Sequence, residues 1–332
     1  MGFNLTELTG DQVAAIVAAL QALEPGLVTT TQAGKLAPDA ECILNGFIKE
    51  ATSGNKGLMS KAFATLLESP EALVFTKGKT LTQNAGFHNS IFRGKSLGSS
   101  VTAAQWSAIG NGTFDDLFIG DYWTINSIVW RIAAFDYWYR CGDTECTTHH
   151  AVIVPDSNLL VADGSTTHWL HHEDKTDGAY VGTDFYQGAN GNNGKSQCRS
   201  KAQSAFGSSH ILTHREHFQN SAMSGSTNVG YATAGTWYDS DIDIMNEPMV
   251  YGSKIYGDVK AGGNIPNMYT IDKSQLPLFA LAPSFICNRA YWWLRDVVSA
   301  AYFAYVNIGG HCHYIGASAS WVGVRPAFGI RA

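Results

Sequence analysis

The stretch from Tyr291 to Phe328, YWWLRDVVSAAYFAYVNIGGHCHYIGASASWVGVRPAF, combines two compositions that predict different environments. Its two ends are apolar, and each carries an arginine, which is typical of a buried framework. Between Val297 and Val322 there is no Lys, Arg, Asp or Glu, and Tyr, His and Trp alternate with Gly, Ser and Ala. Binding loops favour this mixture because rigid aromatic rings give contact area at low entropic cost and small polar residues give adaptable hydrogen bonds. We therefore expect the ends of the stretch in the core and its middle on the surface.

A buried strand and turn is the alternative interpretation of the middle. It accounts for the apolar residues Val297, Phe303 and Val306. It accounts poorly for the polar and aromatic residues that cluster with glycine, because each would need its own buried partner. These residues are Asn307, His311, His313, Tyr314 and Ser320.

The two arginines of the ends, Arg295 and Arg325, would also need carboxylate or carbonyl partners if they are buried. Asp121 and Asp136 are the candidates that the sequence offers for these partners.

Residues 113–290 read as short strands separated by polar loops. The segment FDDLFIGDYWTINSIVWRI (114–132) predicts three strands, with turns at Gly120-Asp121 and Asn126-Ser127. HHAVIVP (149–155) predicts a central strand, and GANGNNG (188–194) predicts an exposed loop. QLPLFAL (275–281) and VRPAFGI (324–330) predict further strands, and the proline in each favours a sheet edge or a strand end. The last of these strands should pair near the first ones and close the domain.

The N-terminal third reads differently. A capping-box pattern at Thr9 and Gln12 opens a predicted helix over residues 9–24, and a second helix is predicted over residues 56–68. Residues 76–100 are rich in Gly, Ser, Thr and Asn and predict a long connection. We therefore expect an α+β protein with a small helical module at 1–112, which anchors or oligomerises the chain, and a main domain at 113–332.

The bulk composition excludes several classes of function. The chain has 332 residues, of which only 15% are charged, a net charge of -6 and no basic run, so nucleic-acid binding has no electrostatic support. No run of 18 apolar residues predicts a membrane span, and the N-terminus lacks the positive charges of a signal peptide. The six cysteines are scattered and do not form a disulfide framework.

The C-terminal stretch resembles the variable region of proteins that are diversified by retroelements, the phage major-tropism-determinant type. The shared pattern is a WLR opening, an S-A-x-x-F-A-x-V middle, a Gly-rich turn and a closing GVRPAF. Upstream, four motifs resemble phage structural proteins of the same fold: FDDLFIGDYWTINSIVWRIAAFDYW (114–138), HHAVIVPD (149–156), NEPMVYGSKIYG (246–257) and QLPLFAL (275–281). The resemblance thus covers residues 113–332, with several motifs in the expected order.

This resemblance implies a C-type-lectin-like domain with one solvent-facing patch that tolerates substitution. Carried over by position, the implied ligand contacts are Tyr302, Tyr305, Asn307, His311, His313, Tyr314, Ser320 and Trp321. Trp321 is less typical of the variable positions and could belong to the framework. The framework would otherwise comprise Trp292, Leu294, Arg295, Val324, Arg325, Pro326 and Phe328.

Three groups of residues could hold a metal ion, and we expect none of them to do so. Cys141 and Cys146 with His149-His150 have spacing at the edge of structural zinc sites, without a second ligand pair. His168, His171 and His172 with Glu173 and Asp174 could hold a divalent ion but read better as a solvated loop. Asp239, Asp241 and Asp243 share one face of a predicted strand and could bind calcium, yet they lack a visible ligand set. We expect no cofactor either.

Catalysis has one candidate centre. Cys312 lies between His311 and His313, but neighbours on a strand point to opposite faces, so neither is placed as a base. The lectin-like scaffold has enzymatic relatives, the formylglycine-generating enzymes, which use a pair of cysteines. In this chain Cys287 and Cys312 would be the corresponding pair. The surrounding motifs do not match, so we expect no enzyme.

The expected function is that of a virion-associated phage protein that binds a host cell-surface protein or glycan. The N-terminal module would contact other virion proteins. The resemblance suggests a homo-oligomer and favours a trimer. Weak binding by each copy would be multiplied by valency. Two alternatives stay open: a purely structural decoration protein of the head or tail, and an enzyme on the formylglycine-generating scaffold.

Overall fold

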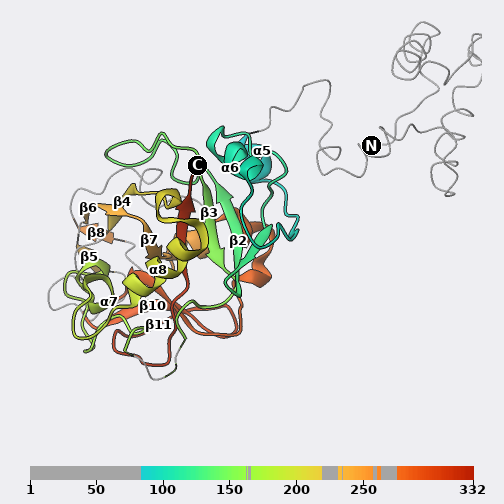
Figure 1. Ribbon diagram of the computed structural model, residues 1–332. Coiled ribbons are helices and arrows are strands. Elements are labelled where there is room, and N and C mark those ends of the chain that lie inside the picture. Colours follow the sequence, from blue (N-terminus) through green and yellow to red (C-terminus); the bar gives the residue numbers. More distant parts are fainter. Residues whose placement is uncertain are drawn as a thin grey trace, which may run out of the picture. The chain divides into compact units, whose positions relative to one another are not determined.

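The computed structural model describes most of the C-terminal three quarters of the chain (Figure 1): residues 84–161, 163, 166–218, 231–233, 235–256, 260–262 and 275–332. The chain divides into two compact units, residues 1–81 and 82–332, and every described residue belongs to the second. The helices predicted over 9–24 and 56–68 lie outside the described residues. So does most of the predicted N-terminal module.

The second unit begins at Thr82, not at residue 113 as the sequence suggested. Two short helices occupy the predicted connection and its continuation: α5 (Ala85–His88) and α6 (Ala103–Gly110). A capping box at Thr102 and Gln105 starts α6, and Gln105 also accepts a hydrogen bond from the indole of the buried Trp123. Ile109 at the end of α6 is fully buried in the core. Residues 84–112 therefore belong with the main domain.

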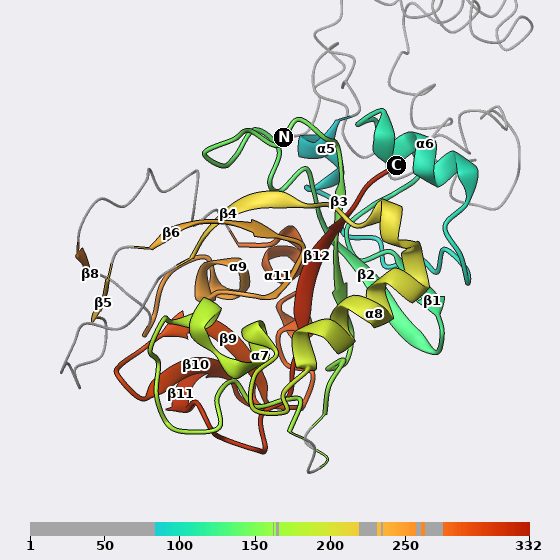
Figure 2. The ribbon, with the colours of Figure 1, turned by 60° about the vertical axis from the view of Figure 1, so that its left-hand side comes forward.

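A five-stranded antiparallel sheet forms the centre of this unit, in the order β1-β2-β3-β12-β7. Its strands are β1 (Tyr122–Ile125), β2 (Ile128–Phe135), β3 (Ala151–Pro155), β12 (Pro326–Ile330) and β7 (Ile242–Ile244). The predicted hairpin turn at Asn126-Ser127 is present, with both residues at positive φ as a type I′ turn requires. The last strand, dark red in Figure 2, lies between β3 and β7, so the chain end closes onto its opening strands as expected.

Two predicted strands are wrong. Residues 114–118 form a turn, because Phe114 and Asp116 adopt left-handed φ values of 55° and 51°. QLPLFAL contains the helix α11 (Pro277–Leu281) instead of a strand. Pro277 occupies its first turn, where the missing N–H costs nothing, and the helix buries Leu278 and Phe279.

Helices cover both faces of the main sheet. Trp130 of β2 packs edge-on against Phe206 at the end of α8 (Gly194–Phe206). The next residue, Arg131, points to the opposite face and lies over the ring of Phe285 in η5 (Pro283–Phe285). None of the described helices is both long and apolar enough to cross a bilayer.

The remaining elements surround this core. They comprise η3 (Tyr180–Gly182), α7 (Asp184–Gln187), η4 (Ser208–His210), α9 (Glu247–Tyr251), the antiparallel pair β4 (His214–Phe218) and β6 (Thr236–Ser240), and the parallel pair β5 (Tyr231–Thr233) and β8 (Lys260–Gly262). With the three-stranded sheet described below, they make the unit an α+β fold of helices and mainly antiparallel sheets.

The two framework arginines are buried as expected, but their partners differ from those proposed. Arg295 pairs with Glu216 of β4 and donates to the carbonyl of Ile244 at 3.1 Å. Arg325 donates to two backbone carbonyls, those of Pro155 and Phe285, each at 2.8 Å.

The aspartates proposed for these arginines have other partners. Asp121 pairs with Arg93, and Asp136 pairs with His149. These partnerships bring together residues far apart in the chain, which spacing in the sequence does not reveal.

Candidate functional site

The middle of the C-terminal stretch forms a three-stranded antiparallel sheet, in the order β11-β10-β9. Its strands are β9 (Trp292–Val297), β10 (Tyr302–Val306) and β11 (Cys312–Gly316). Every residue of β9 is buried, β10 is buried except at Tyr302, and β11, at the other edge from β9, is the most exposed strand. The buried strand β9 therefore holds the accessible strand β11 through β10, although the β9–β10 ladder is irregular between Phe303 and Tyr305.

Asn307 holds the turn between β10 and β11. Its Oδ1 accepts hydrogen bonds from the backbone N–H groups of Gly309 (2.8 Å) and His311 (3.1 Å). Gly310 follows with a φ of +82°, a conformation that favours glycine. A Cβ at this position would lie 3.1 Å from the Cβ of Cys287. The carboxamide oxygen of Asn307, which the sequence assigned to ligand contact, thus shapes the turn that presents His311.

Aromatic side chains contact one another on both faces of this sheet and around its edge strand β11. We call them together the aromatic surface: Tyr256, Tyr291, Tyr302, Tyr305, His313, Tyr314 and Trp321. Trp321 meets Tyr291 edge-on with ring centroids 4.7 Å apart and meets Tyr305 at 5.5 Å. Tyr302 stacks on Tyr314 at 5.6 Å, and Tyr256 meets Tyr314 edge-on at 5.1 Å. Each such pair contributes about 0.5–1.5 kcal/mol beyond area burial, so the rings hold one another in place.

His313 connects the two halves of the aromatic surface. Its ring lies 5.7 Å from that of Tyr305 on one side and 6.3 Å from that of Tyr256 on the other. The rings therefore form one connected set, and the segment that carries most of them, from Val297 to Val322, contains no charged residue.

Seven of the eight predicted ligand contacts are at least partly accessible. Tyr302 is 40% exposed and Trp321 is 42% exposed, so Trp321 lies on the surface and not in the framework. His311, His313 and Ser320 are also exposed, and Asn307 and Tyr314 are half-buried. The exception is Tyr305, which is only 7% exposed because the rings of its neighbours cover it. Its ring packs against those of Trp321 and His313.

The sequence did not single out four further residues at this site: Ile255, Tyr256, Tyr291 and Ile308. Ile255 and Ile308 are 44% and 50% exposed, and with Tyr302 and Trp321 they account for four of the seven exposed large apolar side chains in the described chain. Ile308 lies in the Gly-rich turn, where an apolar residue is difficult to bury. Its exposure could therefore have been predicted from the sequence. Ile255 and Tyr256 reach the site by a tertiary contact that no local pattern predicts.

A buried carboxylate ties this remote loop to the edge strand. Glu247, at the start of α9, accepts hydrogen bonds from the backbone N–H of Ile255 (2.6 Å) and of Tyr256 (3.0 Å). The same side chain accepts from the thiol of Cys312 in β11 at 3.3 Å. The motif NEPMVYGSKIYG thus contains both the anchor and the loop that it anchors.

The two cysteines of this region, Cys287 and Cys312, have different surroundings. Burial and the neighbouring carboxylate of Glu247 raise the pKa of the Cys312 thiol, whereas a nucleophilic cysteine needs a lowered pKa. The Sγ of Cys287 donates to the carbonyl of Ile308 at 3.1 Å, and neither cysteine is in a disulfide. The two thiols therefore have separate hydrogen-bond partners.

Two of the three metal candidates from the sequence are dispersed among other partners. The thiols of Cys141 and Cys146 donate to backbone carbonyls, at 3.3 Å and 3.7 Å. The three aspartates lie on β6, on β7 and between them, and the nearest cation differs for each, although Lys195 also lies 3.9 Å from Asp241. These pairs are Asp239 with Arg215, Asp241 with Arg199 and Asp243 with Lys195.

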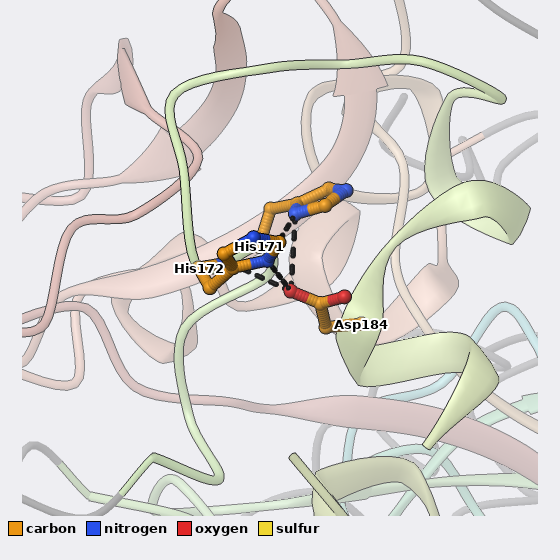
Figure 3. Close-up of side chains that lie close together, drawn as sticks. All are labelled: His171, His172 and Asp184. Carbon is orange, nitrogen blue, oxygen red and sulfur yellow. Dashed lines mark hydrogen bonds and ion pairs between the residues drawn. The ribbon is translucent and has the colours of Figure 1, made fainter. Parts of the chain in front are cut away.

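The third candidate is partly assembled, with a different membership. His171 and His172 come together with Asp184 at the start of α7, as Figure 3 shows. His168 and Asp174, which the sequence grouped with them, bond instead to Val322 and Ser318. In the part of the chain that the structure describes, His171, His172 and Asp184 are the one group of three or more His, Cys, Asp or Glu side chains that brings its ligand atoms together.

No protein-family model matches the sequence, and the comparisons with curated proteins and with solved structures gave no match.

Proposed function

We propose that this chain is a ligand-display protein of a phage virion, with a C-type-lectin-like domain that presents the aromatic surface to a host cell-surface protein or glycan. The observation that carries the proposal is the arrangement of the last three-stranded sheet. Uncharged rings, most of them partly exposed, gather around the strand β11, whereas every residue of β9 at the opposite edge of the sheet is buried. This arrangement separates the residues that hold the fold from those available for contact.

The chemistry of the surface suits recognition. Exposed aromatic and apolar residues are scattered singly on most monomers, whereas a cluster marks an interaction site. Here four of the seven exposed large apolar side chains of the described residues gather around one sheet. Tyr, Trp and His add polar tips that form hydrogen bonds, as in paratopes and in interface cores.

The chain path is consistent with a lectin-like domain. The last strand, β12, returns to the sheet formed by the opening strands, and the aromatic surface lies on the long excursion between β3 and β12. The excursion can vary at its surface without touching the closing strand. A trimer, with residues 1–81 contacting other virion proteins, would supply the valency that weak individual sites need.

A virion decoration protein is the second candidate, since the same surface could contact another capsid or tail protein. An enzyme on the formylglycine-generating scaffold has less support, because the Cys312 thiol is held protonated by burial and by Glu247.

Binding of the purified full-length protein to whole bacteria and to a glycan array tests the proposal. The double variant Tyr302→Ala/Trp321→Ala should lose at least tenfold in affinity while its circular dichroism is unchanged. Leu281→Ala is the matched control, since Leu281 is as exposed as Trp321 but lies on α11, away from the aromatic surface. Equal binding by the double variant, or absence of the protein from purified particles by mass spectrometry, would contradict the proposal.

A further inference from the structure

The histidine-rich segment of residues 168–174, here called the histidine strap, lies along the residues that follow β11. The backbone N–H groups of Leu170 and His171 both donate to the carbonyl of Ala317, at 3.2 Å and 3.1 Å. Asp174 accepts hydrogen bonds from the backbone N–H and the hydroxyl of Ser318, at 3.0 Å and 2.6 Å. The strap therefore supports the segment that leads to Ser320 and Trp321.

Three side-chain atoms converge at the centre of the strap (Figure 3). The Nδ1 atoms of His171 and His172 lie 3.2 Å apart. Both are also close to one carboxylate oxygen, Oδ2 of Asp184, at 3.0 Å and 2.6 Å. The imidazole of His171 and the carboxylate are buried, whereas His172 lies at the solvent boundary.

Protons alone do not satisfy this triangle. Each imidazole Nδ1 carries at most one hydrogen and an ionised carboxylate carries none, so at most two of the three edges can be linear hydrogen bonds. The third edge then places two donors or two lone pairs against each other. A fourth atom adds to the conflict, because the Asn190 amide nitrogen lies 3.0 Å from Nδ1 of His172, a contact that needs a lone pair there. One cation within the triangle would receive a lone pair from every corner.

The surroundings of the triangle also fit a cation. The other ring nitrogen of His172, Nε2, lies 3.5 Å from the carboxylate of Glu173. Metal-bound histidines commonly donate their second N–H to such a carboxylate, which orients the ring.

We propose that His171, His172 and Asp184 form a binding site for a borderline divalent transition metal of the Zn²⁺ class. Two imidazole nitrogens and a carboxylate oxygen are ligands that Zn²⁺ prefers, and they leave one position open toward solvent beside His172. Ligands at about 2.0–2.2 Å from a tetrahedral ion are about 3.4 Å apart, so the closest pair here has to separate by only about 0.8 Å. Bound metal would fasten the strap to α7 and so stiffen the base of the Ser318–Trp321 segment. The site does not depend on the proposed display function.

Calorimetric titration of Zn²⁺ into untagged, chelator-treated full-length protein tests the site. One equivalent should bind with a micromolar or lower Kd, and His172→Gln should weaken binding at least tenfold. His149→Gln is the matched control, because His149 is also half-exposed and bonds to an aspartate, Asp136, at 2.7 Å, yet lies outside any such group among the described residues. The control should bind within twofold of the unmodified protein.

Co²⁺ in place of Zn²⁺ identifies the ligand atoms. Its visible absorption should indicate nitrogen and oxygen ligands, without the charge-transfer band that thiolates give. Asp184→Asn should abolish the spectrum while circular dichroism shows a folded chain. The proposal is overturned if no stoichiometric binding occurs up to about 100 µM Zn²⁺. It is also overturned if His172→Gln binds as tightly as the unmodified protein, or if the spectrum reports thiolate.

Discussion

Glu216→Gln should destabilise the domain strongly, because it breaks the ion pair that joins β4 to the framework strand β9. Glu216 and Arg295 are 5% and 8% exposed, and Arg295 also lies over the ring of Phe218. The second carboxylate oxygen of Glu216 is 3.3 Å from Nε2 of His214. Removing one partner of a buried pair leaves the other charge in a desolvated environment, which typically costs about 3–5 kcal/mol.

The pKa of Glu216 gives a second route to the magnitude. Burial would raise it, but the charge of Arg295 and the hydrogen bond from His214 lower the pKa from its ordinary value of 4.5 to about 2. At about 1.36 kcal/mol per pKa unit, the ionised form gains about 3 kcal/mol in the folded state. Because the folded pKa is the lower one, this stability is fully present well above pH 4.5 and is lost as the pH falls toward 2. The cost of Glu216→Gln should therefore be about 3 kcal/mol near neutral pH and below about 1 kcal/mol near pH 2.5.

Guanidinium unfolding followed by tryptophan fluorescence is the assay. All nine tryptophans lie between residues 106 and 321, so the signal reports the second compact unit alone. Asp239→Asn is the matched control, since Asp239 also pairs with an arginine, Arg215, but on the surface, and its loss should leave the free energy of unfolding nearly unchanged. A Glu216→Gln protein within 1 kcal/mol of the unmodified one at neutral pH, or a cost that does not fall in acid, would refute the reasoning.

Three further outcomes follow from the geometry. Trp292→Ala should lower the free energy of unfolding by about 3–5 kcal/mol because the ring is fully buried, whereas Trp321→Ala should lower it by only about 1 kcal/mol. Equal losses in urea unfolding would contradict the division into framework and surface. Cys312 should resist iodoacetamide in the folded protein at mildly alkaline pH, where its raised pKa keeps the thiol protonated, and react after denaturation, as peptide mass spectrometry can show. Gly316→Ala puts a Cβ 2.2 Å from Oδ1 of Asp174 and should cost about 1 kcal/mol. In a protein that already carries Asp174→Ala, Gly316→Ala should lower the free energy of unfolding only slightly further. If the two losses instead add fully, the contact with Asp174 is not the cause of the Gly316→Ala loss.

Local sequence patterns predicted the strands that have both a clear pattern and a matching environment. HHAVIVP contains β3, and VRPAFGI contains β12 with its proline at the first strand position, as expected. The strand predicted for QLPLFAL was wrong because a short apolar run fits a strand or a buried helix equally well. Pro277 was interpreted as a strand end, whereas it starts a helix. The strand predicted for FDDLF was wrong because two non-glycine residues adopt left-handed backbone conformations, which amino-acid composition does not predict.

The candidate site was predictable where composition alone decides exposure. The absence of charge between Val297 and Val322 indicated the accessible edge of the sheet, but it did not distinguish Tyr302 from Tyr305, which lie on opposite faces of one strand. Contacts between residues far apart in the sequence could not be predicted. Asp184 joins His171 and His172 only because α7 packs against the strap.

Natural variation in this gene among closely related genomes tests the central claim most directly, because it reports which positions are free to change while the domain still folds. If the aromatic surface is a display surface on a separate framework, substitutions concentrate at the accessible positions and spare Trp292, Arg295 and Arg325. The accessible positions are Tyr302, His311, His313, Ser320 and Trp321. Variation spread evenly over residues 84–332, or an unchanged aromatic surface in genomes that differ elsewhere in the gene, would contradict the account.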